Sequence, residues 1–272
     1  MRKLGYKVFQ RCRLAYRKTV TSSSLSTNLL QTFLFFLLAE RQRVARFHLK
    51  NKLAFFARPA DWVGVEEIAL EGEYNFIAPF LAHNSMPVVL DLGANIGMFS
   101  MLVFSLCPTA IIHAVEPGDK TYEVLEYNRQ ANPGLSWHTY RAAIWDEAGK
   151  INFADNATAS TASYVSPDGG NKQIPTGRLS DLINKIGSNI DLLKMDIEGA
   201  EERVLYQSQH LLNKIDTLIV EIHPYRCNQA RVVHLLKESF DYLYQVGRQS
   251  SAKPLLIASR TRWNLPDYLL SD

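Results

Sequence analysis

Residues 88–97 read VVLDLGANIG, an apolar run that leads into two glycines. The run has the length and composition of a buried strand. Gly93 lets the backbone turn tightly and approach a ligand, and Gly97 permits close packing where a helix begins. The GxxxG spacing differs from the GxGxxG of dinucleotide binders, so no pyrophosphate cradle is expected. The stretch therefore predicts a cofactor-binding turn between a strand and a helix, with an ordinary turn of this kind as the alternative.

The sequence after residue 88 alternates short apolar runs with amphipathic stretches at regular spacing. This pattern is typical of βαβ units around a parallel sheet and predicts an α/β fold. Residues 155–175 are rich in small and polar residues and predict a long loop with a role in ligand selection. The expected strands are 88–92, 111–115, 136–143, 151–153, 192–196, 218–222, 242–246 and 255–258, and the expected helices are 96–105, 120–131, 179–186, 200–207 and 229–240.

A carboxylate ends the second expected strand. Glu116 closes the stretch IIHAVEP, one strand after the glycine turn. A carboxylate at this place can accept hydrogen bonds from two ribose hydroxyls. A surface glutamate at a strand end is the plainer alternative. Together with Gly93, Glu116 indicates a cofactor that contains a ribose.

Two later strands also end in polar residues. In LLKMDIEGAE, Asp196 and Glu198 follow a strand, and ligands of open α/β sheets bind beyond the carboxyl ends of strands. His223 follows LIVEI, where a neutral imidazole can take a proton from a substrate hydroxyl or bond a loop carbonyl. Asp196 and His223 are therefore the candidate catalytic residues. Glu201 and Glu202 are interpreted as acids of a first helical turn, which the helix dipole favours.

Two charged residues lie inside otherwise apolar strands. Lys194 and Glu221 each precede a strand-end residue by two positions, so they share a face with Asp196 and His223 respectively. Unpaired buried charges are costly. We therefore expect Lys194 and Glu221 to lie on adjacent strands and to pair, directly or through one shared acid, so that they orient the site.

Taken together, these motifs resemble the FkbM family of S-adenosylmethionine (SAM)-dependent methyltransferases. The resemblance runs from about residue 72 to 222, and more loosely to 259. It implies a Rossmann-like class I methyltransferase fold, with a mostly parallel seven-stranded sheet, helices on both faces and one antiparallel strand near an edge. It also implies O-methylation of a small-molecule, sugar or glycan hydroxyl. The motifs that carry it are GEYNFIAPFL, DLGANIG, AVEP, RLSDL, LLKMDIEGAE and VEIHP.

The resemblance implies SAM as the cofactor and assigns its contacts by motif. The first four residues named below would line the methionine portion, the glutamate would hold the ribose, and the last two would lie near the adenine. Asp196 would face the transferred methyl. The residues expected to bind the cofactor are Asp91, Gly93, Asn95, Gly97, Glu116, Ala142 and Ala143.

For the reaction itself, His223 ranks slightly ahead of Asp196 as the base that takes the hydroxyl proton. No metal site is expected, although Asp196 and Glu198 offer oxygen ligands for Mg²⁺ if a third ligand exists. One departure from the family pattern is Ser180, where RLSDL usually carries an aspartate directly after the leucine. A serine can replace an aspartate that caps a helix, but a substrate contact would change the acceptor.

The N-terminal 60 residues differ in charge from the rest. They hold 13 Lys and Arg against the single acid Glu40, whereas later residues hold 17 basic and 26 acidic groups. We predict a basic helical extension over 1–60 and a methyltransferase domain over 61–272. The apolar run 29–39 is about half the length of a membrane span. The extension is expected either to pack on the domain as a cap or to rest on anionic lipid.

Cys12, Cys107 and Cys227 lie far apart without a CxxC pair, so the sequence favours a reducing cytoplasm, with contact at the cytoplasmic membrane face as an option. One rival is an RNA methyltransferase whose basic arm holds phosphates. The stretch DIEG lacks the Asn/Asp-Pro-Pro-aromatic motif of enzymes that methylate exocyclic base nitrogens, so nucleic acid is not the expected partner. A second rival is a non-catalytic SAM-fold binding module at a membrane surface.

Overall fold

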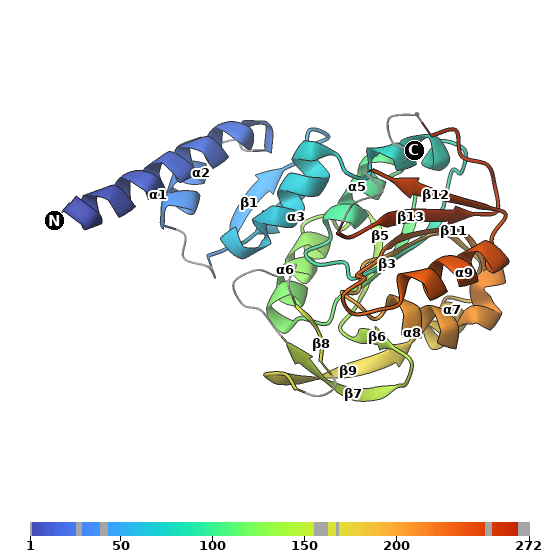
Figure 1. Ribbon diagram of the computed structural model, residues 1–272. Helices are drawn as coiled ribbons and strands as arrows, with labels where there is room; N and C mark the ends of the chain where they lie inside the picture. Colours follow the sequence, from blue (N-terminus) through green and yellow to red (C-terminus); the bar gives the residue numbers. More distant parts are fainter. Residues whose placement is uncertain are drawn as a thin grey trace.

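The computed structural model describes residues 2–25, 29–38, 43–154, 163–166, 169–247 and 252–265 (Figure 1). Within these residues, seven strands form a central sheet in the order β12-β13-β11-β10-β3-β4-β5. All neighbours pair in parallel except β13, which runs antiparallel to both β11 and β12. The expected seven-stranded sheet with one antiparallel strand near an edge is confirmed. Its strands are β3 (Val88–Leu92), β4 (Ile111–Val115), β5 (Ser136–Tyr140), β10 (Ile190–Met195), β11 (Ile215–Glu221), β12 (Tyr242–Val246) and β13 (Leu255–Ser259).

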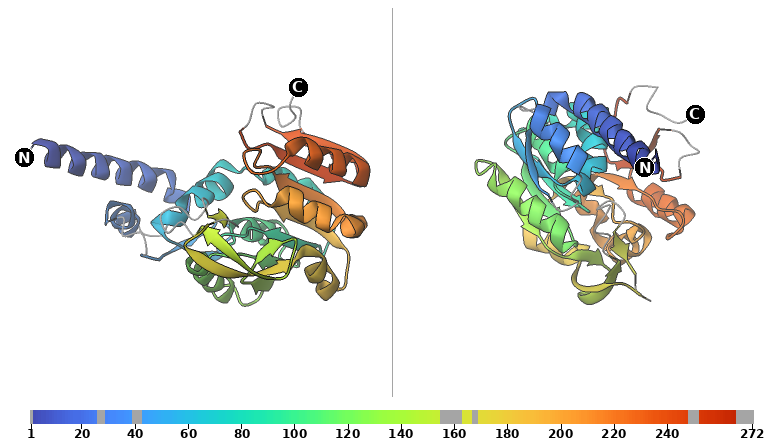
Figure 2. Two further views of the ribbon diagram at one scale, coloured as in Figure 1. Left: turned by 60° about the horizontal axis from the view of Figure 1, so that its bottom comes forward. Right: turned by 90° about the vertical axis from the view of Figure 1, so that its left-hand side faces the viewer.

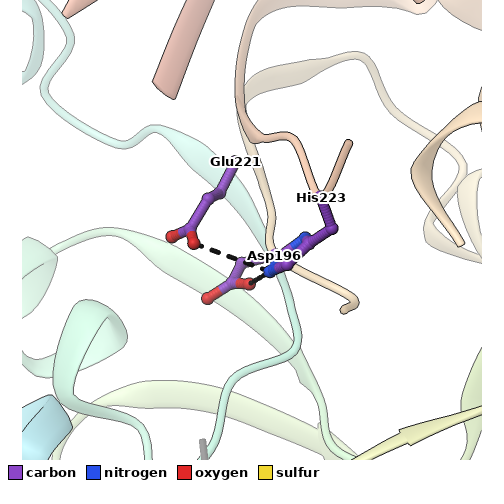
Figure 3. Close-up of side chains that lie close together, drawn as sticks. All are labelled: Asp196, Glu221 and His223. Atoms are coloured by element: carbon purple, nitrogen blue, oxygen red, sulfur yellow. Dashed lines mark ion pairs between the residues drawn. The ribbon is translucent and has the colours of Figure 1, made fainter. Parts of the chain in front are cut away.

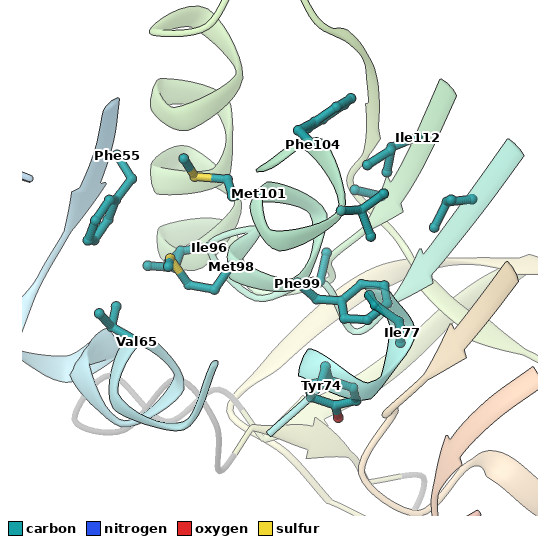
Figure 4. Close-up of a cluster of buried hydrophobic side chains, with 14 of the residues drawn as sticks. Phe55, Val65, Tyr74, Ile77, Ile96, Met98, Phe99, Met101, Phe104 and Ile112 are labelled. Carbon is teal, nitrogen blue, oxygen red and sulfur yellow. The ribbon is translucent and has the colours of Figure 1, made fainter. Parts of the chain in front are cut away.

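Successive residues of β3 point to opposite faces of the sheet, because side chains alternate along a strand. Val89 joins one apolar core with Phe99 of the following helix, and Leu90 joins the other core with Leu179 and Val204. Figure 4 shows part of the first core, where the helix after β3 packs on the sheet. Helices therefore cover both faces, as expected. They are α5 (Met98–Leu106), α6 (Asp119–Gln130), α7 (Leu179–Ile186), α8 (Glu201–Gln207), η6 (Gln209–Lys214) and α9 (Gln229–Ser239).

The order of strands reverses between β3 and β10. From β3 the chain moves outward through β4 to β5, and then returns to β10 on the other side of β3. In open α/β sheets this reversal leaves a crevice beyond the carboxyl ends of the two strands, where ligands bind. The residues that follow β3, β4, β10 and β11 should therefore meet there.

A second sheet lies where the sequence predicted a loop. Its strand order is β6-β9-β7-β8. Residues 155–162 and 167–168 of the expected loop lie outside the described residues, but 164–165 and 172–175 belong to strands. The loop prediction is wrong there, since the polar composition hides the apolar positions of β9, where Ile174 faces Phe153. The strands are β6 (Ala143–Trp145), β7 (Gly149–Ala154), β8 (Tyr164–Val165) and β9 (Lys172–Arg178).

The N-terminal helices α1 (Arg2–Thr21) and α2 (Leu29–Leu38) pack on each other and project from the α/β body (Figure 2). Residues 45–57 are not helical, in contrast to the sequence-based expectation. They form a hairpin of β1 (Ala45–His48) and β2 (Ala54–Ala57), because Phe47 and Phe55 are buried and stack at 5.4 Å. Asn128 of α6 and Asn132, just after that helix, accept hydrogen bonds from the backbone of β2.

Short helical turns connect the hairpin to β3. They carry apolar residues into the first core, among them Val65, Tyr74 and Ile77. No helix among the described residues is long and apolar enough to span a membrane. The short elements are η1 (Ser23–Leu25), η2 (Pro59–Asp61), α3 (Trp62–Val65), η3 (Glu66–Glu71), η4 (Asn75–Ile77) and α4 (Ala78–Leu81).

Candidate active site

The glycine turn after β3 adopts the strained geometry that its sequence predicted. Gly93, Asn95 and Gly97 have φ values of 73°, 52° and 88°. A Cβ atom on Gly93 would lie 1.7 Å from the backbone oxygen of Asp196, where the ends of the paired strands β3 and β10 lie side by side. Glycine at position 93 is thus required both by backbone conformation and by the close approach of the two strands.

A pocket opens beyond the carboxyl ends of β3, β4, β10 and β11. It brings together most residues predicted from separate parts of the sequence. Ser163, Tyr164 and Val165, near the predicted loop, also line it. The predicted residues in its wall are Gly93, Asn95, Glu116, Ala142, Ala143 and Asp196.

Glu116 is held in place by the backbone around it. Its Oε2 accepts a hydrogen bond from the Asn95 amide at 3.0 Å, and its Oε1 accepts one from the Gly118 amide at 2.8 Å. The residue is 7% exposed. A carboxylate offers two acceptor oxygens with two lone pairs each. The arrangement suits recognition of a vicinal diol such as a ribose.

Asp91 and Gly97 lie behind the turn and do not line the pocket. Asp91 is fully buried, and its Oδ2 accepts a hydrogen bond from Ser100 Oγ at 2.6 Å. A Cβ on Gly97 would lie 2.5 Å from the Trp137 ring and 2.7 Å from Leu125. Both residues support the turn from inside the domain, and their expected contact with the methionine portion stays a prediction.

Lys194 ties the ends of β3 and β10 together. Its Nζ donates a hydrogen bond to Gly93 O at 3.0 Å and lies 3.5 Å from Asp196 Oδ2 and 3.8 Å from Asp91 Oδ1. Burial opposes the charge, but these carboxylates outweigh it and raise the pKa of Lys194. The predicted adjacency of the two strands is confirmed. Of the two predicted arrangements, the direct pair between Lys194 and Glu221 is not formed, and Lys194 contacts Asp196, a candidate for the shared acid of the alternative.

Glu221 instead pairs with a lysine that the sequence reading did not single out. Its Oε1 lies 3.2 Å from Lys253 Nζ and 3.6 Å from His223 Nε2. Burial and the carboxylate of Asp196 raise the pKa of Glu221 to about 7, against the opposing charge of Lys253. Figure 3 shows the side chains of Asp196, Glu221 and His223 converging from the ends of β10 and β11. The link between Lys194 and Glu221 therefore runs through Asp196 and His223.

His223 lies behind the pocket wall and is fully buried. Its Nδ1 donates a hydrogen bond to Glu201 Oε1 at 2.9 Å, and its Nε2 lies 3.2 Å from Glu198 Oε2. Burial opposes a charge on the ring, but the contacts with Glu198 and Glu201 outweigh it and raise the pKa of His223 to about 10. Because an imidazolium has no lone pair for another proton, these contacts favour Asp196 over His223 as the base, and the role of His223 stays a prediction. Glu201, interpreted as a helix acid, is its partner.

The part of the sequence that forms this site matches the model of a known family. The model of the methyltransferase FkbM domain matches residues 91–248, which include the glycine turn, Glu116 and the strand ends. The chain belongs to the FkbM methyltransferase family. The resemblance stated from the motifs is confirmed.

The curated relatives of this FkbM-family chain are methyltransferases. Methyltransferase 1 of Beauveria bassiana is 27% identical over 252 residues, which cover 80% of this chain and 98% of that protein. The 31-O-demethyl-FK506 methyltransferase FkbM of Streptomyces tacrolimicus is 30% identical and covers 55% of this chain and 70% of its own length. The hexuronic acid methyltransferase AglP of Haloferax volcanii is 30% identical, with 58% and 67% covered.

Solved structures are similar only at the level of the general fold. The N-terminal domain of human METTL16 in complex with SAH has a TM-score of 0.44 and 11% identity, and the match covers 71% of this chain and 70% of that domain. Precorrin-6y C5,15-methyltransferase of Geobacter metallireducens has a TM-score of 0.43, 12% identity and coverage of 71% and 89%.

Three acidic or aromatic residues of the FkbM-family pocket received no role from the sequence. Glu67, Glu73 and Tyr74 line it from the segment before β3. Burial and the nearby Glu67 raise the pKa of Glu73 to about 7. The motif GEYNFIAPFL contains Glu73 and Tyr74, so the resemblance marked their position but gave no reason for it. Pairing of strands cannot place them either, because no strand carries them.

Proposed function

We propose that this methyltransferase transfers the methyl group of SAM to a hydroxyl of a sugar, glycan or other small molecule. The observation that carries the proposal is the pocket itself. Part of its lining is Gly93, Asn95 and Glu116, a turn and a carboxylate suited to a ribose, and the acidic ends of β10 and β11 line it beside the turn. Both parts of the lining lie at the strand-order reversal, where α/β sheets bind ligands.

The pocket residues fit SAM by their chemistry. Glu116 is a carboxylate at the pocket wall, the kind of group that accepts from ribose hydroxyls, and the small Ala142 and Ala143 leave space for the adenine ring. Asp196, beside the turn, provides negative charge for a ligand that carries a sulfonium. SAM would supply the methyl group, and the protein residues would hold it in the orientation that transfer needs.

For the reaction, we assign Asp196 as the group that receives the proton of the acceptor hydroxyl. Its side chain is 28% exposed and lines the pocket, whereas the buried His223 does not. Bound SAM would supply the methyl group, with the electron pair of the broken carbon–sulfur bond left on sulfur, and Asp196 would lie beside the acceptor hydroxyl. The hydroxyl proton moves to an Asp196 oxygen. Glu201 and His223 then serve to position the acids around Asp196.

A groove next to the pocket suits a sugar acceptor. The two share Tyr164, Val165 and Glu198. Trp145 and Tyr206 also line the groove, and an arginine guanidinium lies over each of these two rings. Aromatic faces beside hydrogen-bond donors match the apolar faces and hydroxyls of sugar rings. Two relatives are named for hydroxyl or uronate methylation, which supports an acceptor of this class.

The assignment of Asp196 is tested by Asp196→Asn with tritiated methyl SAM and a panel of monosaccharides, uronates and glycans. Loss of a proton acceptor typically lowers turnover by about 10²–10⁴-fold. We expect that loss together with nearly unchanged affinity for S-adenosylhomocysteine (SAH). The control is Asp181→Asn, which changes an exposed aspartate of α7. Undiminished turnover in Asp196→Asn would reject Asp196 as the proton acceptor.

We further propose that the basic N-terminal helices rest on an anionic membrane at the cytoplasmic face. Four leucines of α2 are exposed, with 37% to 68% of each residue accessible to solvent. They are Leu29, Leu30, Leu34 and Leu38. On α1, Tyr16 and Val20 are also exposed, next to Arg13 and Arg17. Exposed apolar side chains together with basic residues favour the interface of an anionic bilayer. This proposal would place the active site close to membrane-linked acceptors.

A further inference from the structure

The side chains that end β10 and β11 offer three ligand atoms around one point. One carboxylate oxygen each of Asp196 and Glu221 and a ring nitrogen of His223 all lie within 4.8 Å of one another (Figure 3). His223 Nε2 is 3.9 Å from Asp196 Oδ1 and 3.6 Å from Glu221 Oε1. Two ligand atoms that each lie about 2.1 Å from the same ion are at most about 4.2 Å apart. Both distances from Nε2 therefore allow a shared ion, after a small inward rotation of the carboxylates.

Two of these atoms are buried without a hydrogen-bond partner among the described residues. They are Asp196 Oδ1 and His223 Nε2, and His223 is fully buried. Buried polar atoms in folded proteins nearly always have a partner, which can be an ion. The two atoms lie 3.9 Å apart, and Glu198 Oε2, at 3.2 Å from Nε2, is an ion-pair neighbour without the geometry of a hydrogen bond. The two unpartnered atoms point to a ligand independently of the number of acids nearby.

The second nitrogen of His223 is already fixed. Nδ1 donates its hydrogen bond to the buried Glu201, which leaves the Nε2 lone pair on the side of Glu198, Glu221 and Asp196, whose oxygens lie at 3.2, 3.6 and 3.9 Å. Histidines that bind metals show this arrangement, with one ring nitrogen on the ion and the other bonded to a carboxylate. A proton and a metal ion are alternatives for the same lone pair.

Charge around these ligand atoms also favours a cation. Four carboxylates surround the ring of His223, those of Asp196, Glu198, Glu201 and Glu221. Among the described residues, the ammonium groups of Lys194 and Lys253 lie against these acids. Lys253 is 39% exposed and can withdraw towards solvent. With a neutral imidazole, two negative charges remain, which one divalent cation balances.

We infer that Asp196, Glu221 and His223 bind one divalent cation of the first transition row, for which Mn²⁺ is the probe. One imidazole and two carboxylates suit such ions and leave coordination positions open towards the pocket. The purpose of the ion rests on the proposed function: it would hold the oxygen of the acceptor hydroxyl beside the methyl group. Of the pair noted from the sequence, Asp196 is a ligand of this site, whereas Glu221 and His223 take the other two positions in place of Glu198.

The inference is tested by titrating chelator-treated protein with Mn²⁺, followed by the loss of the free-ion electron paramagnetic resonance signal. We expect one ion per chain. Glu221→Gln should weaken the affinity at least tenfold, and Glu201→Gln, which removes the support of Nδ1, should weaken it about 10–100-fold. The matched control is His234→Gln, which removes a surface histidine paired with Glu238 at 3.3 Å. It should leave the affinity unchanged.

Circular dichroism of each variant shows whether the fold is retained, and Asp196→Asn provides a third variant if Glu201→Gln unfolds. Absence of stoichiometric binding, or binding that Glu221→Gln and Asp196→Asn leave intact, would overturn the inference. SAH binding by the same samples separates the two proposals. SAH binding without Mn²⁺ binding rejects the metal site alone, and Mn²⁺ binding without SAH binding rejects the proposed cofactor while the metal site stands.

Discussion

Glu116 joins the glycine turn to the end of β4 by accepting hydrogen bonds from the amides of Asn95 and Gly118. In Glu116→Ala both amides lose their hydrogen-bond acceptor, and the ribose of the cofactor loses the acceptors for its two hydroxyls. Hydrogen bonds to a charged group contribute about 1.5–3 kcal/mol, so we expect SAH affinity to fall about 10–100-fold. Isothermal titration calorimetry measures the change.

The matched control for this variant is Glu123→Ala. Glu123 lies on the next helix with its side chain 58% exposed, and it pairs only loosely with Lys120 at 3.9 Å. Its removal should leave SAH affinity within about twofold, since surface pairs contribute little. Equal affinities for Glu116→Ala and Glu123→Ala would contradict the assigned role of Glu116.

At the scale of residues, the sequence could predict which positions end strands but not the state of each side chain. Asp196 and Glu116 follow strands of clear apolar pattern, and the fold brings them into one pocket. The charge on His223 could not be foreseen, because it depends on Glu198 and Glu201 approaching the ring from another strand and helix. Lys253 was equally hidden, since its partners are distant in sequence.

The start of α5 depends on Gly97, whose φ is 88° and whose missing side chain leaves space for Trp137 and Leu125. Gly97→Ala adds a left-handed backbone penalty and a clash with those side chains. Together these effects should reduce the free energy of unfolding by about 2–4 kcal/mol, measured by urea denaturation.

Gly177→Ala is the control for Gly97→Ala. A Cβ at Gly177 meets no atom within 4 Å. Its effect on the free energy of unfolding should be near zero. If the two alanine variants unfold at the same urea concentration, the packing role of Gly97 is wrong.

The free energy of unfolding should depend on pH through His113, a residue of β4 that packs against β5. His113 stacks on His138 at 4.8 Å and bonds Tyr140. Burial, with the charges of His138 and Lys185, lowers the pKa of His113 to about 4 from 6.5. The unfolded chain therefore binds a proton first, so this contribution to stability is present above pH 6.5 and is lost as the pH falls towards 4.

His113→Phe keeps the ring but removes the titration. We expect wild-type protein to lose up to about 3 kcal/mol of unfolding free energy between pH 6.5 and 4 through His113, and His113→Phe to lose correspondingly less. His210→Phe, at an exposed histidine, should retain the wild-type slope. Thermal unfolding across this pH range decides, and a wild-type slope in His113→Phe would exclude the effect.

Elements with strong apolar periodicity were predicted closely, whereas those defined by tertiary contacts were not. Strands β3, β4 and β12 and helix α7 have the expected bounds. The sequence predicts a helical extension where the hairpin of β1 and β2 lies, because the short apolar runs within this basic segment show no strand alternation. Asn128 of α6 and Asn132 just after it, both far along the chain, complete the hydrogen bonds of the hairpin. The strand β9 escaped notice because Pro175 and Gly177 lie within it.

At the scale of the molecule, the N-terminal helices project from the α/β body with exposed leucines and basic residues (Figure 2). Binding to vesicles that contain anionic phospholipid should exceed binding to neutral vesicles. Arg13→Glu with Arg17→Glu should weaken it at least fivefold for each change, because each basic residue near the surface contributes about 1 kcal/mol. Vesicle sedimentation measures both effects.

Leu30→Ser with Leu34→Ser should also weaken vesicle binding, since these leucines would enter the interface. Met86→Ser is the control, because Met86 is 60% exposed on the α/β body rather than on α2. Equal binding to neutral and anionic vesicles would contradict the proposed surface. Tighter, salt-sensitive binding to RNA than to vesicles would favour the rival partner, a nucleic acid.

The central claim is that the pocket beyond β3, β4, β10 and β11 binds SAM. Its most direct test is calorimetric titration of the wild-type protein with SAH, with NAD⁺ as the comparison ligand. We predict one SAH per chain, with a dissociation constant in the range of about 1 μM to 1 mM that is common for enzyme ligands, and no binding of NAD⁺. Absence of SAH binding at millimolar concentration, or preferential binding of NAD⁺, would contradict the claim.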